Sequence, residues 1–159
     1  MDDFSLALAL GVLASGLFSG ILAAVLFLLQ RVLKGLDARD FTRVMQGFLP
    51  LARKAPINLI LTLASVLAPA AALLLGREDA GRLTWVLTLA GMLVFLAGPF
   101  LLSRYAAEPL YDVILGWGVQ SPPADWRVVR ERYFRINRLR TASSWLAFLL
   151  LVLALTLPR

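Results

Sequence analysis

The sequence predicts an all-α protein: an integral membrane four-helix bundle with one short amphipathic interfacial helix and a long fourth helix that projects from the membrane. Three observations support this fold class. Hydrophobic residues make up 60% of the 159 residues, and the mean hydropathy of +0.79 exceeds that of an ordinary soluble domain. The apolar residues fall into four runs of membrane-spanning length. A basic amphipathic stretch leads directly into the fourth run.

The four runs predict a single transmembrane domain over residues 1–159. Phe4–Leu29 carries no charge and follows Asp2-Asp3 rather than the basic start of a signal peptide, so we expect a retained anchor. Proline opens the second run at Pro56, where a helix tolerates it. The predicted spans are residues 4–29, 56–75, 83–103 and 142–157.

Two helical stretches are predicted outside the spans. Residues 38–51 have apolar side chains at helical spacing, which is typical of a helix lying on the membrane surface, with Asp37 or Asp40 as its cap. The last helix is predicted to start at Ser121 and Pro122, because no further glycine or proline interrupts it before Pro158. Residues 122–141 would then form a cytoplasmic extension of the fourth span.

The net charge of +6 reflects 16 basic and 10 acidic residues. Residues 30–55 carry six of the basic residues and residues 103–141 carry seven. Because basic loops stay in the cytoplasm, we expect an integral protein of a bacterial inner membrane with both termini outside. The lipid bilayer is the expected partner, and the charge pattern does not suggest nucleic-acid binding.

Cysteine and histidine are both absent. Their absence excludes disulfides, thiol nucleophiles, Cys/His zinc sites, histidine-ligated haem and Ser-His-Asp triads. A general acid or base would have to be Asp, Glu, Tyr or Lys, or a water held by Arg and Asn. We expect no cofactor and no metal.

Polar residues form stripes on the second and third spans. Asn58 and Thr62 follow one face of the second span, and Thr88 lies on a small-residue face of the third. The stripes predict hydrogen bonds between helices or, alternatively, a ligand site in the bundle core.

Charged residues near the fourth span are the candidates for chemistry. Glu108 and Asp112 are four residues apart and should share one helix face. Arg140 and Arg132 fall inside the apolar arc of residues 125–141, with Asn137 at its edge. We expect the carboxylates to pair with Arg140, Arg132 or Arg104, because an unpaired charge at a membrane boundary is costly. Snorkelling of the arginines to lipid phosphate is the alternative.

Gly16 and Gly20 form a GxxxG pair in the first span. Small residues at this spacing let helices approach closely. The pair predicts packing inside the bundle or, alternatively, a homo-oligomer.

Several short motifs resemble those of the anthrone oxygenase-like family of small four-span membrane proteins. The resemblance rests on the order of the spans, on Phe41–Met45-Gln46, on Glu108-Pro109-Leu110 and above all on Trp126…Arg132…Asn137-Arg138-Leu139-Arg140-Thr141. The chain departs from the family where Arg138 replaces its histidine and where Glu108 and Tyr111 replace asparagines.

The resemblance implies a protein that binds or oxidises an apolar aromatic small molecule in the bundle core, with O2 and no cofactor. Glu108 or Asp112 would be the base, and Asn137 and Arg140 would stabilise an enolate oxygen. The implied substrate-binding residues are Asn58, Thr62, Thr88, Trp126 and Thr141. The alternative is a non-catalytic structural or accessory membrane protein.

Overall fold

The computed structural model describes residues 2–157, and all its regular secondary structure is helical. Among these residues, four helices are long and apolar enough to cross a membrane: Asp3–Lys34, Pro56–Leu75, Leu83–Leu115 and Trp126–Thr156. The all-α class and the four candidate spans are thereby confirmed.

The first long helix consists of α1 (Asp3–Ala24), the π-helical segment η1 (Val25–Leu29) and α2 (Gln30–Lys34). The side chain of Asp2 caps its start by accepting a hydrogen bond from the backbone N–H of Ser5 at 2.9 Å. The helix continues past the predicted span, because no breaker follows Leu29 until Gly35.

Helix α3 (Ala38–Lys54) begins at the predicted place. Its cap is Asp37, which accepts a hydrogen bond from the backbone N–H of Asp40 at 2.9 Å. The apolar face of α3 is buried against protein, with Phe41 and Met45 fully covered in a cluster that includes residues of α6 and α7. A position along a membrane surface stays a prediction.

The middle of the chain forms two antiparallel helices. Helix α4 (Pro56–Leu75) leads through the 3-10 turn η2 (Arg77–Asp79) into a helix made of α5 (Leu83–Phe95), η3 (Leu96–Leu101), η4 (Ser103–Ala107) and α6 (Glu108–Leu115). The segments η3 and η4 are π-helical and lie around Pro99, whose missing N–H interrupts the regular hydrogen-bond pattern. The helix therefore continues past residue 103, the predicted end of the third span, to Leu115.

The last helix, α7 (Trp126–Thr156), begins later than predicted. Ser121 and Pro122 lie outside it, so the predicted start of the extension at residue 122 is wrong. The reason is the second proline: Pro123 disfavours the helical conformation for Pro122, the residue before it.

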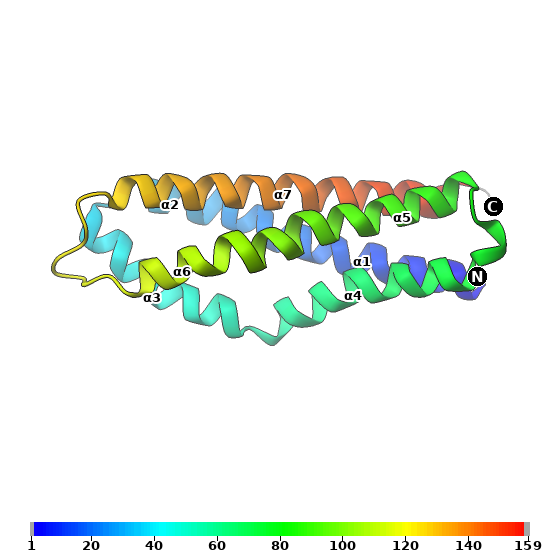
Figure 1. Ribbon diagram of the computed structural model, residues 1–159, viewed down its shortest axis with the longest axis horizontal. Helices are drawn as coiled ribbons and strands as arrows, with labels where there is room; N and C mark the ends of the chain where they lie inside the picture. Colours follow the sequence, from blue (N-terminus) through cyan, green and yellow to red (C-terminus); the bar gives the residue numbers. More distant parts are fainter. Residues whose placement is uncertain (1, 158–159) are drawn as a thin grey trace.

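The four long helices lie side by side along the long axis of the molecule, with both termini at the end opposite the α2–α3 turn (Figure 1). Helix α1 packs along α4 and α7, and α5 packs along α7 and α4. Close approach is possible where glycines face bulky residues: a Cβ on Gly11 would lie 2.7 Å from Cγ of Pro69. Helices α3, α6 and the first half of α7 form a separate core at the far end.

Gly16 packs within the chain. A Cβ on Gly16 would lie 2.8 Å from the Phe148 ring, whereas a Cβ on Gly20 would have nothing within 4 Å. Gly16 thus supports the contact between α1 and α7. The homo-oligomer through Gly16 and Gly20 stays a prediction.

Candidate functional site

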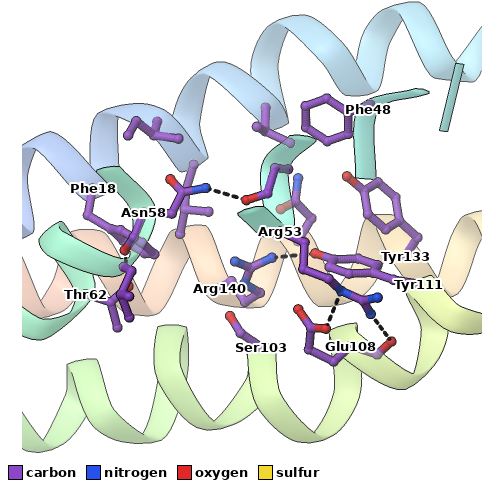
Figure 2. A pocket seen from close by; sticks show the side chains of 16 residues that line it. Phe18, Phe48, Arg53, Asn58, Thr62, Ser103, Glu108, Tyr111, Tyr133 and Arg140 are labelled. Atoms are coloured by element: carbon purple, nitrogen blue, oxygen red, sulfur yellow. Dashed lines mark hydrogen bonds and ion pairs between the residues drawn. The ribbon is translucent and has the colours of Figure 1, made fainter. Parts of the chain in front are cut away.

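A cavity of about 370 Å³ lies where α1, α3, α4, α6 and α7 meet (Figure 2). One part of its wall is apolar, and this part comes from Phe18, Ile21, Leu22, Val25, Phe48, Ala52 and Leu59. The other part is polar, and it comes from Arg53, Asn58, Thr62, Ser103, Glu108, Tyr111, Tyr133, Asn137 and Arg140.

Helix irregularities surround the cavity. The chain bends at Ala55, which has extended backbone angles and precedes Pro56. Asn58 spans this bend by donating from Nδ2 to the carbonyl of Ala52 at 2.8 Å. The π-helical segments η1 and η4 begin at Val25 and Ser103, which both line the cavity. Such π-helical turns are frequent at functional sites.

Helix α7 supplies two polar side chains with unused donors. Asn137 is 2% exposed, and its Nδ2 has no hydrogen-bond partner among the described residues. Arg140 donates from Nη1 to the hydroxyl of Tyr111 at 3.0 Å, while its buried Nε has no partner in the same part of the chain. Both residues line the cavity, so two polar side chains of α7 with unused donors border it, while the donor nitrogens themselves are buried.

The carboxylates are paired with Arg53 of α3. Arg53 Nε lies 2.6 Å from Glu108 Oε2, and Nη2 lies 3.0 Å from Asp112 Oδ1. Burial would lower the pKa of the Arg53 guanidinium, but its hydrogen bond to Asp112 and the charge of Glu108 together raise that pKa. Arg53 is therefore a permanent cation on the cavity wall.

The predicted partners of the carboxylates are wrong. Arg140 contacts Tyr111 instead of Glu108 or Asp112. Arg132 and Arg104 are both exposed, and among the described residues the ion pairs of these carboxylates are with Arg53. The physical reason is the packing of α3 against α6, which places the Arg53 guanidinium within contact distance of both carboxylates.

The structure brings together Asn58, Thr62, Glu108, Asn137 and Arg140, all of which line the cavity. The other four predicted site residues lie elsewhere. Asp112 has a side chain that is 68% exposed, and Thr88 is buried in α5, where it donates to the carbonyl of Thr84 at 2.8 Å.

Trp126 and Thr141 are also outside the cavity. Trp126 packs against Phe41 in the far core, with ring centroids 5.8 Å apart. Thr141 is buried and donates to the carbonyl of Asn137 at 2.8 Å. Thr141 thus contacts the backbone of a cavity residue without lining the cavity itself.

Sequence reasoning missed Arg53, Ser103, Tyr111 and Tyr133 as cavity residues. Tyr111 and Tyr133 form a tilted aromatic pair with centroids 6.1 Å apart, and the Arg53 guanidinium lies 5.9 Å from the Tyr111 ring centre. A usable signal was the position of Arg53 three residues before the break at Pro56, which places it near Asn58 in the chain.

The fold and the site define a class: an all-helical protein with four helices fit to cross a membrane and a mixed polar and apolar cavity among them. Within the part of the chain that is described, no three acidic side chains gather as metal ligands. No family model matches the chain, and neither does any characterised protein or solved structure.

Proposed function

We propose that this chain is an integral membrane protein that binds a flat, largely apolar aromatic molecule carrying a carbonyl or phenolate oxygen. The observation that carries this proposal is the pair of buried, unpartnered donors on the cavity wall, Asn137 Nδ2 and Arg140 Nε. A buried donor without a partner costs about 1–3 kcal/mol. A ligand oxygen would recover that cost once these side chains turn their donors toward it.

The cavity has the composition expected of such a site. Its volume of about 370 Å³ is within the usual range for small-molecule pockets, which are mostly apolar with a few convergent polar groups. Phe18 and Phe48 would contact the rings of the ligand, and Asn137 and Arg140 would orient its oxygen. The donors select an acceptor, because neither Nδ2 nor Nε can accept a hydrogen bond.

Oxidation is the further step that the resemblance implies. An anthrone and O2 would give an anthraquinone and water, once a base removes a proton from the ring CH2 group. Glu108 lines the cavity, but its Oε2 is already held by Arg53 Nε at 2.6 Å. The carboxylate would have to leave this contact to act as a base. Binding is therefore better supported than oxidation.

A titration tests the proposal directly. The full-length protein in lipid nanodiscs is titrated with 1,8-dihydroxyanthraquinone, and binding is followed by ligand fluorescence. Asn137→Leu and Arg140→Gln should each raise the Kd about tenfold, which corresponds to one lost hydrogen bond of about 1.4 kcal/mol. Thr88→Val is the matched control, because it removes a buried hydroxyl outside the cavity. Unsaturable binding to the wild-type protein would refute the proposal.

Oxygen uptake measures the second step. Adding anthrone to the same nanodiscs should consume O2 faster than empty nanodiscs do, if the chain is an oxygenase. Glu108→Gln should abolish the extra uptake while leaving the protein folded by circular dichroism. Equal uptake with and without protein would restrict the function to binding.

One observation favours a non-catalytic structural or accessory membrane protein instead. Arg53 joins α3 to α6 through two carboxylates, and Arg140 joins α7 to α6 through Tyr111. Under this alternative, Arg140→Gln would lower the melting temperature and change no ligand affinity.

We also propose that the α2–α3 turn and the α6–α7 loop face the cytoplasm of a bacterial cell. The support is the excess of Lys and Arg in residues 30–55 and 103–141. Both termini would then lie outside, at the opposite end of the molecule (Figure 1).

A further inference from the structure

A groove of about 390 Å³ adjoins the cavity on the side of α4 and η3. Four residues line both hollows: Arg53, Thr62, Ser103 and Glu108. The groove adds Pro99, Phe100 and Arg104. Because the two hollows share part of their walls, a molecule in the groove is separated from the cavity by a few side chains only.

The backbone is irregular on both sides of the groove. The bend at Ala55 sends the start of α4 away from α7, and the α3–α4 junction lies farthest from α7 in Figure 1. The π-helical turns of η3 and η4 carry Pro99 and Ser103. The Ser103 hydroxyl donates to the Pro99 carbonyl, so this backbone acceptor has a partner despite the irregular helix.

The exposed part of the groove is mixed, because Phe100 and Arg104 both line it and are both exposed. Phe100 is 42% exposed and lines the groove, and Leu63, next to Thr62, is 47% exposed. Thr62 is the seventh residue of α4, about 9 Å along the helix from Pro56. If α4 crosses a bilayer from Pro56, the mouth lies near the membrane boundary, where Phe100 can contact lipid chains and Arg104 can reach lipid phosphate.

The ion pair of Arg53 and Glu108 lies between the groove and the cavity. Arg53 contacts Glu108 at 2.6 Å, Asp112 at 3.0 Å, and the Glu108 carbonyl at 3.2 Å. Its side chain is only 31% exposed. Because Arg53 and Glu108 line both hollows, a molecule that moves from the groove to the cavity passes beside this ion pair.

We propose that the groove is a lateral entrance from the lipid and that Arg53, held by Glu108 and Asp112, is its gate. The inference rests on the proposed function and narrows it, because a ligand that enters this way is a molecule dissolved in the bilayer. A lateral entrance excludes water-soluble substrates, which would reach the cavity from the aqueous phase. Arg53 acts here as a positioning residue that sets the rate of access.

The absence of cysteine from the sequence allows a direct test. A single cysteine is introduced by Phe100→Cys, labelled with a bulky maleimide in detergent and reconstituted into nanodiscs. Leu93→Cys, labelled identically, is the matched control, because Leu93 is 51% exposed on the same long helix and lines neither hollow. Stopped-flow fluorescence gives the association and dissociation rates of 1,8-dihydroxyanthraquinone.

The label at position 100 should slow association and dissociation together by about tenfold or more, with an unchanged Kd. The label at position 93 should change neither rate. Equal rates in both labelled proteins would overturn the lateral entrance while leaving the proposed binding function intact. Unsaturable binding in the unlabelled wild-type protein would overturn both.

Asp112→Asn tests the gate separately. Asp112 lies outside the cavity, and the substitution weakens one of the contacts that hold Arg53. Both rates should rise by up to about fivefold at constant Kd, the range expected for one exposed ion pair. Unchanged rates would show that Arg53 does not control access.

Discussion

Replacing Asn137 by leucine should make the empty protein more stable. The Asn137 amide is buried at 2% exposure, and its Nδ2 finds no partner among the described residues. A buried donor in this state costs about 1–3 kcal/mol, and leucine has nearly the same size without a polar group. We therefore expect Asn137→Leu to stabilise the protein by about 1–2 kcal/mol in the absence of ligand.

The assay is thermal unfolding in detergent at a fixed scan rate, followed by circular dichroism. For a chain of this length, 1 kcal/mol shifts the melting temperature by about 2–4 °C, so the expected rise is about 2–8 °C. Asn58→Leu is the matched control, since it makes the same substitution at an amide that also lines the cavity. The Asn58 amide donates to the Ala52 carbonyl at 2.8 Å across the bend.

The two variants should move in opposite directions. Asn58→Leu leaves the Ala52 carbonyl without its partner and should lower the melting temperature by a few degrees, about 1 kcal/mol or more. A fall in melting temperature for Asn137→Leu would refute the reasoning, because it would mean that the Asn137 amide is satisfied in the folded protein. The ligand experiment gives the other half of the prediction: the variant that melts higher should bind more weakly.

Three further predictions concern the helix packing, the ion pairs of Arg53 and the topology. Gly11→Ala should destabilise the protein by about 1–3 kcal/mol in the same melting assay, because its Cβ would lie 2.7 Å from a proline ring, whereas Gly20→Ala should have no such effect, because nothing lies within 4 Å. Arg53→Gln should lower the melting temperature by about 2–6 °C, since two carboxylates lose their cation; an unchanged melting temperature would mean that the network contributes nothing. A membrane-impermeant maleimide should label Glu78→Cys in intact cells and Ser121→Cys only after permeabilisation, and the reverse pattern would invert the proposed topology.

The sequence predicted the fold class because its signal is local. Four runs of apolar residues are read directly from composition, and each corresponds to a long helix. The π-helical segments and the exact helix ends depend on backbone geometry, which composition does not report. Apart from Pro99, no residue pattern indicates the π-helical segments. The continuation of the third long helix through α6 to Leu115 was therefore not predicted.

The candidate site was predicted in part, for a reason that the helix geometry makes clear. Asn137 and Arg140 were identified because polar residues inside an apolar arc have to face something, and both line the cavity. Thr88 shares a helix with Ser103 but precedes it by about 22 Å of helix, so a stripe of small residues does not fix depth. The prediction that Trp126 lines the site was wrong for the same reason, because Trp126 lies about 16 Å along α7 from Asn137.

Arg53 was missed because its partners are distant in sequence. The pairing of Arg53 with Glu108 and Asp112 depends on how α3 packs on α6, and no spacing rule within one helix reports that contact. The expected partners were Arg140, Arg132 and Arg104 instead. In the folded chain, the packing of α3 on α6 pairs both carboxylates with Arg53.

The cavity exists because three helices lose their regularity at one level while the fourth does not. The bend at Ala55 separates α3 from α4, and π-helical turns begin at Val25 and Ser103. Helix α7 runs unbroken past Asn137 and Arg140, so these two donors stand on a rigid element. The amide of Asn137 is buried, but no described residue brings an acceptor to its Nδ2. Buried donors without partners destabilise the folded chain. The proposed ligand would supply the acceptor that these donors lack.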